Sequence, residues 1–253
     1  EDIDAVIETL KSSFLTQGPK VPDFEKAICN YTGSQFSLAF NSATSALHAA
    51  CLALDLAEGD ILWTSPISFV ASANCGLYCG AKVDFVDIDP STNNMCPNAL
   101  EKKLIESKEK GALPKVVIPV HLSGMPCDMK KISSLAKKYN FKIIEDASHA
   151  IGSEYDGSKT GNCIYSDICI FSFHPVKIIT TGEGGVALTN CNKLYKKLSL
   201  LRTHGITRDE KLMSIPPDGP WYYEQHILGF NYRMTDIQAS LGISQLSKIN
   251  EFI

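Results

Sequence analysis

The chain has 253 residues, of which 44% are hydrophobic and 21% charged, a composition typical of one large globular domain or of one domain with part of a second. The formal net charge of −4 gives no electrostatic reason to expect nucleic acid or an anionic membrane as a partner. Apolar runs stop well short of the ~20 residues that cross a bilayer, and the acidic start EDIDAVIETLKSS lacks the basic start and apolar core of a signal peptide.

Predicted helices open the chain. Apolar residues recur with helical period over 3–10 and again over 24–28, on either side of a turn-like segment at 17–19. An alternation then follows, with strands expected at 37–40, 61–64, 83–88, 115–120, 141–146, 167–173 and 185–189, and helices at 42–54, 68–79, 97–108, 128–139 and 191–203. This alternation predicts an α/β fold with a mainly parallel sheet and helices on both faces, whose ligands bind beyond the carboxyl ends of the strands.

The Pro/Gly-rich segment 216–220 is the one break in this pattern, and it divides the chain into a predicted large domain, 1–215, and a second region, 216–253. The last periodic stretch reaches Ile253 without a capping residue, so we expect a C-terminal portion to be missing.

Nine scattered cysteines, an odd number without a CxxC pair, argue against a disulfide framework and favour a reduced, cytoplasmic setting. Cys75 and Cys79 have one-turn helical spacing, but no second Cys/His pair lies nearby in the sequence. We therefore expect buried small hydrophobic side chains here and no metal site.

The segment FSFHPVKIITTGEGG (171–185) places a single lysine, Lys177, between a buried strand and a glycine-rich turn. A lysine in a pocket of low dielectric has a lowered pKa and can form a Schiff base, and glycines let the backbone pass close to a flat ligand. The alternative is a solvated loop lysine.

Asp146, at the end of the apolar strand FKIIED (141–146), favours the Schiff-base interpretation of Lys177. A buried carboxylate there is energetically costly unless it meets a cation, such as a protonated pyridine nitrogen. The alternative is that Asp146 caps the next turn.

Three further residues lie at predicted strand ends. Thr44 begins a helix in NSATSALHAA, where backbone N–H groups and its hydroxyl suit a phosphate, although a plain N-cap explains the same residues. Ser172 ends a strand five residues before Lys177 and can donate to the same phosphate. Phe69, in SPISFVAS, is placed either to stack on a pyridine ring or to join the core.

Taken in order along the chain, NSATSALHAA, SPISFVASAN, GAKVDFVDID, PVHLSGMPCDM, EDASHAIGSEY, FSFHPVKIITTGEGG, LRTHG and LGFNYRMTDIQASLGISQL resemble the DegT/DnrJ/EryC1/StrS family of sugar aminotransferases. The resemblance implies the fold-type I (aspartate-aminotransferase-like) fold and pyridoxal 5′-phosphate (PLP) as cofactor. It also implies a C-terminal small domain that is largely missing after Ile253.

Residue roles follow from the same resemblance. Lys177 is expected to bind PLP covalently as a Schiff base and to act as the acid/base, Asp146 to pair with the pyridine nitrogen, and His149 to lie near the ring. The remaining expected cofactor-binding residues are Ala43 through its N–H, Thr44 and Ser172 at the phosphate, Phe69 on the ring, and Asn231, which reaches the phosphate of a neighbouring subunit. A homodimer with shared active sites is implied, and His204 and Arg233 are candidates for the substrate diphosphate or the donor carboxylate, or are exposed loop charges.

Within the family, NSATSAL, SPISFVASAN, SHAIGSEY and FSFHPVKIITTGEGG most resemble the branch of pseudaminic acid biosynthesis. That branch implies a PLP-dependent nucleotide-sugar aminotransferase that moves the amino group of L-glutamate to C4 of a UDP-4-keto-6-deoxy-N-acetylhexosamine, leaving 2-oxoglutarate. Three alternatives stay open: another 3- or 4-keto nucleotide sugar, a non-catalytic binding or regulatory protein with the PLP fold, and a nicotinamide-dependent oxidoreductase. The last is disfavoured because no GxGxxG follows the first strand. A related sugar dehydratase is also disfavoured, since such relatives have His in place of Lys177.

Overall fold

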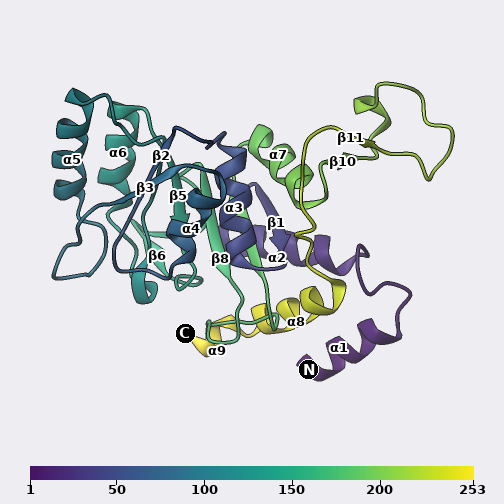
Figure 1. The fold of residues 1–253 in the computed structure, drawn as a ribbon. Helices are drawn as coiled ribbons and strands as arrows, with labels where there is room; N and C mark the ends of the chain where they lie inside the picture. The colour runs from purple at the N-terminus through teal and green to yellow at the C-terminus, as the bar shows by residue number, and fades with distance from the viewer.

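A seven-stranded sheet forms the centre of the fold in the computed structural model, which describes residues 1–253 (Figure 1). Its strands, in spatial order, are β1 (Phe36–Phe40), β9 (Gly185–Thr189), β8 (Ile168–Ser172), β5 (Lys142–Asp146), β4 (Val116–Ile118), β2 (Ile61–Thr64) and β3 (Lys82–Phe85). The strands from β8 to β3 pair in parallel, whereas β9 pairs antiparallel with both β8 and β1. The predicted mainly parallel α/β sheet is confirmed.

Helices cover both faces of this sheet (Figure 1). One face carries α3 (Ala43–Ala53), α4 (Ala71–Tyr78) and α7 (Asn192–Arg202). The other carries α2 (Lys20–Thr32) and α8 (Asp236–Ser247) over one half, and α5 (Pro97–Glu109) and α6 (Met129–Tyr139) over the other half. Two further helices, α1 (Asp2–Lys11) and α9 (Ile249–Phe252), lie near the ends of the chain.

Strand β8 illustrates why the sheet needs helices on both sides. Ile168 and Ile170 join the core under α3, whereas Cys169 and Phe171 join the core under α2 and α8, and all four are fully buried. Successive side chains of a strand point to opposite faces, so a continuous apolar run requires cover on both.

Two predicted strands are shorter than expected. The strand predicted at 115–120 ends at Ile118, because Pro119 has no N–H to donate to the ladder. The strand predicted at 83–88 ends at Phe85, because Ile88 pairs with Met95 across a tight turn instead of continuing along β2. Several short elements were not predicted. They are the two-stranded pairs β6 (Glu154–Tyr155) with β7 (Ser158–Lys159) and β10 (Ile206–Thr207) with β11 (Glu224–Gln225), and the 3₁₀ turns η1 (Leu122–Gly124) and η2 (Glu210–Leu212).

Helix α8 joins the end of the chain to its beginning, and it packs against α1 and α2. The buried carboxylate of Asp236 accepts the backbone N–H groups of Gly18 and Lys20, both at 2.8 Å. Beyond the helix, Lys248 Nζ lies 2.8 Å from Asp2 Oδ1. The division predicted between residues 1–215 and 216–253 stays a prediction.

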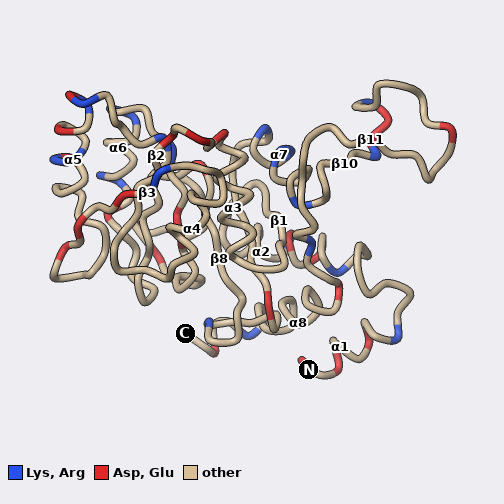
Figure 2. Tube along the Cα trace, in the orientation of Figure 1, with Lys and Arg blue, Asp and Glu red and all other residues tan.

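Charged residues of both signs lie mainly on the outer helices and the connecting segments, whereas α3, α4, β1 and β8 carry none (Figure 2). No helix of the structure is both long enough and apolar enough to cross a membrane.

Gly185 lies where β9 approaches the first turn of α3, and a side chain there has no room. A Cβ atom on Gly185 would lie 2.4 Å from the backbone nitrogen of Ala43. We expect Gly185→Ala to lower the free energy of unfolding by about 3 kcal/mol, measured by urea denaturation followed by circular dichroism.

Gly76→Ala is the matched control. Its Cβ would meet only side-chain atoms of Leu62 and Val83, at 3.1–3.2 Å, and helix α4 would gain propensity. Equal stability losses in the two variants would contradict the close approach of β9 to α3.

Candidate active site

A cavity of about 250 Å³ lies at the carboxyl ends of β1, β2, β5 and β8, where ligands bind in open α/β sheets. Its lining residues are Ser42, Ala43, Thr44, Leu47, Ser68, Phe69, Ala71, Val120, Asp146, Ser148, His149, Ser172, His174, Val176, Lys177 and Glu183. Seven of the eight predicted site residues are therefore brought together, and Asn231 is the exception.

One end of the cavity is the N-terminus of α3. Ser42 caps this helix, since its hydroxyl accepts the Ser45 N–H at 3.1 Å. The backbone N–H groups of Ala43 and Thr44, and the Thr44 hydroxyl, have no hydrogen-bond partner within the chain. Such unpaired donors at a helix N-terminus bind anions, so the Ser42 cap and an anion site coexist here.

Ser172 adds a donor next to this helix end. Its side chain ends β8, is 8% exposed, and accepts the His174 N–H at 3.4 Å. The proton of its hydroxyl has no acceptor within the chain, which leaves it available to a ligand.

Asp146, at the end of β5, supplies the negative charge of the cavity. It is 4% exposed, and its carboxylate accepts the Ser72 hydroxyl at 2.5 Å and the Ser148 hydroxyl at 2.6 Å. No cationic side chain lies within ion-pair distance of it. A buried carboxylate held only by neutral donors favours a cationic ligand group.

Lys177 follows β8 in a turn closed by its own N–H, which donates to the His174 carbonyl at 2.9 Å. Its half-buried amine lines the cavity and makes no hydrogen bond within the chain. Burial lowers the pKa of this amine below its usual value, and the charge of Asp146 raises it in part. A larger share of Lys177 is therefore neutral than of a solvated lysine, as a nucleophile or general base requires.

His149 lies three residues after Asp146 and is half-buried in the cavity wall. Burial lowers its pKa, the amine of Lys177 lowers it further, and Asp146 opposes both effects. The Ser123 N–H donates to His149 Nδ1 at 3.2 Å. At neutral pH the ring is therefore held largely in its uncharged form.

Phe69 is 71% exposed although it lines the cavity, so it is not the core residue that the alternative interpretation expected. Its ring face is available for stacking on a flat ligand.

Three residues singled out from the sequence lie outside the cavity. Asn231 is exposed, and its backbone pairs with Thr203. Arg233 lines a different cleft, beside Arg202 and Glu25. His204 occupies a tight turn in which its N–H donates to the Phe230 carbonyl at 2.9 Å.

Four further residues of the site were not predicted from the sequence. Ser148 had a local signal, since a serine two residues after an aspartate commonly donates to it. Ser72 had none, because it lies 74 residues before its partner Asp146. His174 and Glu183 also line the cavity, on either side of Lys177 in the sequence. No group of three or more His, Cys, Asp or Glu side chains is arranged to hold a metal ion.

Comparison with known proteins gives a consistent result. The model of the DegT/DnrJ/EryC1/StrS aminotransferase family matches residues 1–253. The chain is 45% identical over 250 residues to the UDP-4-amino-4,6-dideoxy-N-acetyl-beta-L-altrosamine transaminase of Campylobacter jejuni, covering 98% of this chain and 62% of that protein. The chain thus spans about 62% of the length of the curated relatives it matches.

Solved structures share the fold. Helicobacter pylori PseC, an aminotransferase involved in the biosynthesis of pseudaminic acid, superposes with a TM-score of 0.87 at 36% identity, covering 99% of this chain and 63% of that one. The protein Spr1654 of Streptococcus pneumoniae in its PLP form gives a TM-score of 0.84 at 31% identity, covering 99% of this chain and 64% of that one. The architecture is therefore that of the PLP-dependent aminotransferases, as predicted.

The environment of Lys177 has a measurable consequence. Because burial holds the pKa of Lys177 below the ordinary lysine value, we expect its acylation by an amine-reactive reagent to reach half-maximal rate at a lower pH than that of the exposed Lys196. Asp146→Asn removes the charge that raises this pKa, so the midpoint for Lys177 should fall further. Peptide mass spectrometry across a pH series measures both midpoints.

Asp167→Asn, which removes a charge beside Lys142 instead, is the control. A Lys177 midpoint equal to that of Lys196, or one unmoved by Asp146→Asn, would refute the shared environment of Asp146 and Lys177.

Proposed function

Because the chain belongs to the DegT/DnrJ/EryC1/StrS aminotransferase family, we propose that its cavity is the active site of a PLP-dependent aminotransferase that acts on a keto sugar nucleotide. The cofactor is pyridoxal 5′-phosphate. One observation carries the proposal: the amine of Lys177 and the buried carboxylate of Asp146, which has no cation of its own, line one cavity with the unpaired N–H groups of α3.

The residues present fit this cofactor. The free N–H groups of Ala43 and Thr44 and the hydroxyls of Thr44 and Ser172 offer donors for a phosphate dianion. Asp146 offers an uncompensated carboxylate for a protonated ring nitrogen, and Phe69 an open face for the ring. When bound, PLP supplies an electron sink for the carbon atom that gains or loses the amino group.

We assign the chemistry to three side chains. Lys177 Nζ would hold the cofactor covalently, and its lowered pKa suits the same amine to accept and return the proton of the reacting carbon. Asp146 would keep the ring nitrogen protonated, and its own position is fixed by Ser72 and Ser148. His149, half-buried in the cavity wall, would contact the ring.

For the substrates, we propose L-glutamate as donor and C4 of a UDP-4-keto-6-deoxy-N-acetylhexosamine as acceptor. Two relatives support this choice: the C. jejuni protein is named as a UDP-4-amino-4,6-dideoxy-N-acetyl-beta-L-altrosamine transaminase, and H. pylori PseC is described as an aminotransferase of pseudaminic acid biosynthesis. Another 3- or 4-keto nucleotide sugar is the competing acceptor, and a PLP-binding protein without turnover is the competing function.

We further propose a cytoplasmic homodimer in which Asn231 reaches the phosphate site of the second subunit. Its exposed position outside the cavity of its own chain agrees with such a role. Arg233 and His204 remain candidates to bind the substrate diphosphate or the donor carboxylate. Residues 216–253 are proposed to form the start of the second domain.

Borohydride reduction tests the central assignment. With PLP added, we expect a fixed adduct on the peptide that contains Lys177, and none in Lys177→Ala, because no other amine lines the cavity. Absorbance and peptide mass spectrometry detect the adduct, and Lys196→Ala is the control. A stable adduct on another lysine in the Lys177→Ala variant would refute the assignment.

Turnover separates the competing functions. Addition of glutamate should bleach the cofactor absorbance and release 2-oxoglutarate, and NMR of the sugar product identifies the acceptor. A protein that binds PLP but is not bleached by glutamate would be a binding protein instead.

A further inference from the structure

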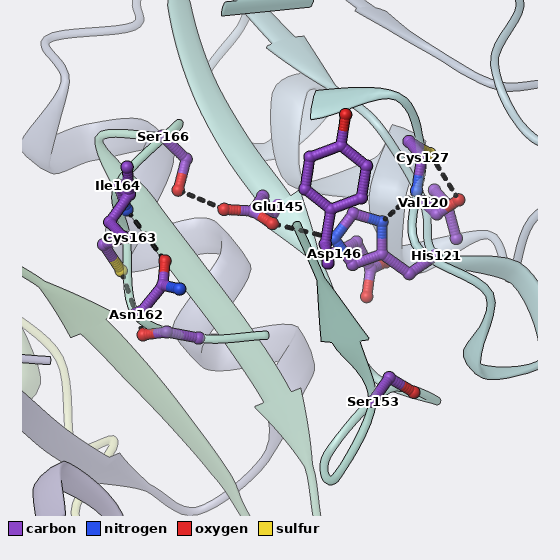
Figure 3. Close-up of polar contacts among 12 residues, drawn as sticks. Val120, His121, Cys127, Glu145, Asp146, Ser153, Asn162, Cys163, Ile164 and Ser166 are labelled. Carbon is purple, nitrogen blue, oxygen red and sulfur yellow. Dashed lines mark hydrogen bonds and ion pairs between the residues drawn. The ribbon is translucent and has the colours of Figure 1, made fainter. Parts of the chain in front are cut away.

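A buried polar network is built around Glu145 of β5 and His121 (Figure 3). Glu145 and Asp146 are neighbours on this strand, so their side chains leave opposite faces of the sheet. Glu145 Oε2 lies 2.8 Å from His121 Nε2, and its other oxygen accepts the hydroxyl of Ser166. The His121 side chain is 0% exposed and that of Glu145 8%. The cavity and this network therefore share one strand end.

The hydrogen bonds fix which nitrogen of His121 carries the proton. The Cys127 N–H, which can only donate, points at His121 Nδ1 at 3.2 Å. Nδ1 is therefore the acceptor, and Nε2 carries the proton that it donates to Glu145. Figure 3 shows His121 between Glu145 and Cys127. Every polar side-chain atom of His121 and Glu145 has a hydrogen-bond partner. Because His121 begins loop 121–127 and accepts the N–H of Cys127, which ends it, the His121–Glu145 pair fixes both ends of this loop.

Loop 121–127 is held from two further directions. Asn94 Oδ1 accepts the Leu122 N–H at 3.0 Å, and the Ser153 hydroxyl donates to the Gly124 carbonyl at 2.6 Å. Between these contacts, Ser123 has a left-handed backbone with φ of 53°. A non-glycine residue keeps such a conformation only where its surroundings enforce it, and strained residues of this kind cluster at functional sites.

The strained residue is the one that touches the cavity wall, since the Ser123 N–H donates to His149 Nδ1 at 3.2 Å. We infer that loop 121–127, held by the His121–Glu145 pair, is a positioning device that fixes His149 as the neutral tautomer with its proton on Nε2. The use of that proton in the cavity rests on the proposed function.

This arrangement suits a cavity that holds an amine. A protonated Nδ1 would face the Ser123 N–H donor to donor, so the imidazolium form loses this contact. The titratable groups that share the cavity with His149 are Asp146, His174, Lys177 and Glu183. His149 thus keeps an uncharged N–H donor in the cavity beside Lys177. Because the ring carries no charge, it does not compete with the Lys177 ammonium for the carboxylate of Asp146.

The test is ¹⁵N NMR of the histidine rings in the chain without cofactor, which does not depend on any activity. We expect a protonated Nε2 and a bare Nδ1 for His149 in the native chain. In Glu145→Ala, His121 Nε2 has no acceptor and loop 121–127 is no longer fixed. We therefore expect His149 to populate both neutral tautomers and its pKa to rise by about 0.5 to 1 unit, the equivalent of one lost hydrogen bond.

Glu145→Gln should restore the native pattern, because its amide oxygen can accept from His121 and its NH₂ can donate to Ser166. Glu101→Gln, which removes a surface partner of Lys138, is the matched control and should change nothing. A purely structural role for Glu145 would lower stability in both Glu145 variants without moving the tautomer of His149.

Ser153→Ala provides a milder test if Glu145→Ala does not fold, since it releases only the Gly124 contact, and it should shift the His149 titration in the same direction by a smaller amount. A bare Nε2 in the native chain, or an unchanged His149 titration in a folded Glu145→Ala or Ser153→Ala variant, would overturn the inference. Failure of the proposed function would instead appear as absence of a Lys177 adduct while the His149 tautomer is as expected.

Discussion

The buried negative charge at the end of β5 is the constraint on which the rest of the site depends. The Asp146 N–H donates to the Pro119 carbonyl and its carbonyl accepts the His121 N–H, both at 3.0 Å, while the next N–H, that of Ala147, donates to the Ile170 carbonyl at 2.9 Å, so the main chain at this point is fixed on both sides. Its carboxylate receives only neutral donors. An ion in that position is costly until it meets a positive group. The nearby amine of Lys177 meets part of that need, and a protonated ring nitrogen would meet the rest.

A second, positive pole of the cavity is set by backbone contact. Because Gly185 has no side chain, β9 approaches the first turn of α3 closely, and the free N–H groups of Ala43 and Thr44 line the same cavity as the buried acid. A ligand with a phosphate at one end and a basic nitrogen at the other matches both poles. Neither pole requires a charged side chain on the surface, which agrees with the modest net charge of −4.

Most of this arrangement was predictable from the sequence for one reason. In a parallel sheet all carboxyl ends lie at one edge, so Thr44, Phe69, Asp146 and Lys177 could be grouped from strand predictions alone. Contacts between distant residues were not accessible in this way: Ser72 has no local signal that links it to the acid, and His121 and Glu145 read as ordinary polar residues at strand ends. Two-residue strands such as β10 and β11 are too short to leave a period-2 pattern.

The contact between α1 and α8 brings together residues that lie at nearly the maximum sequence separation in the chain. The ion pair of Lys248 with Asp2 spans 246 positions. Closing so large a loop costs more chain entropy than forming a local contact. The α1–α8 pair should therefore form late during folding, once the sheet already holds the two ends of the chain close together. The same reasoning makes it a place where the native state opens without global unfolding, and amide hydrogen exchange in α1 should report on that local equilibrium and not on the stability of the central sheet.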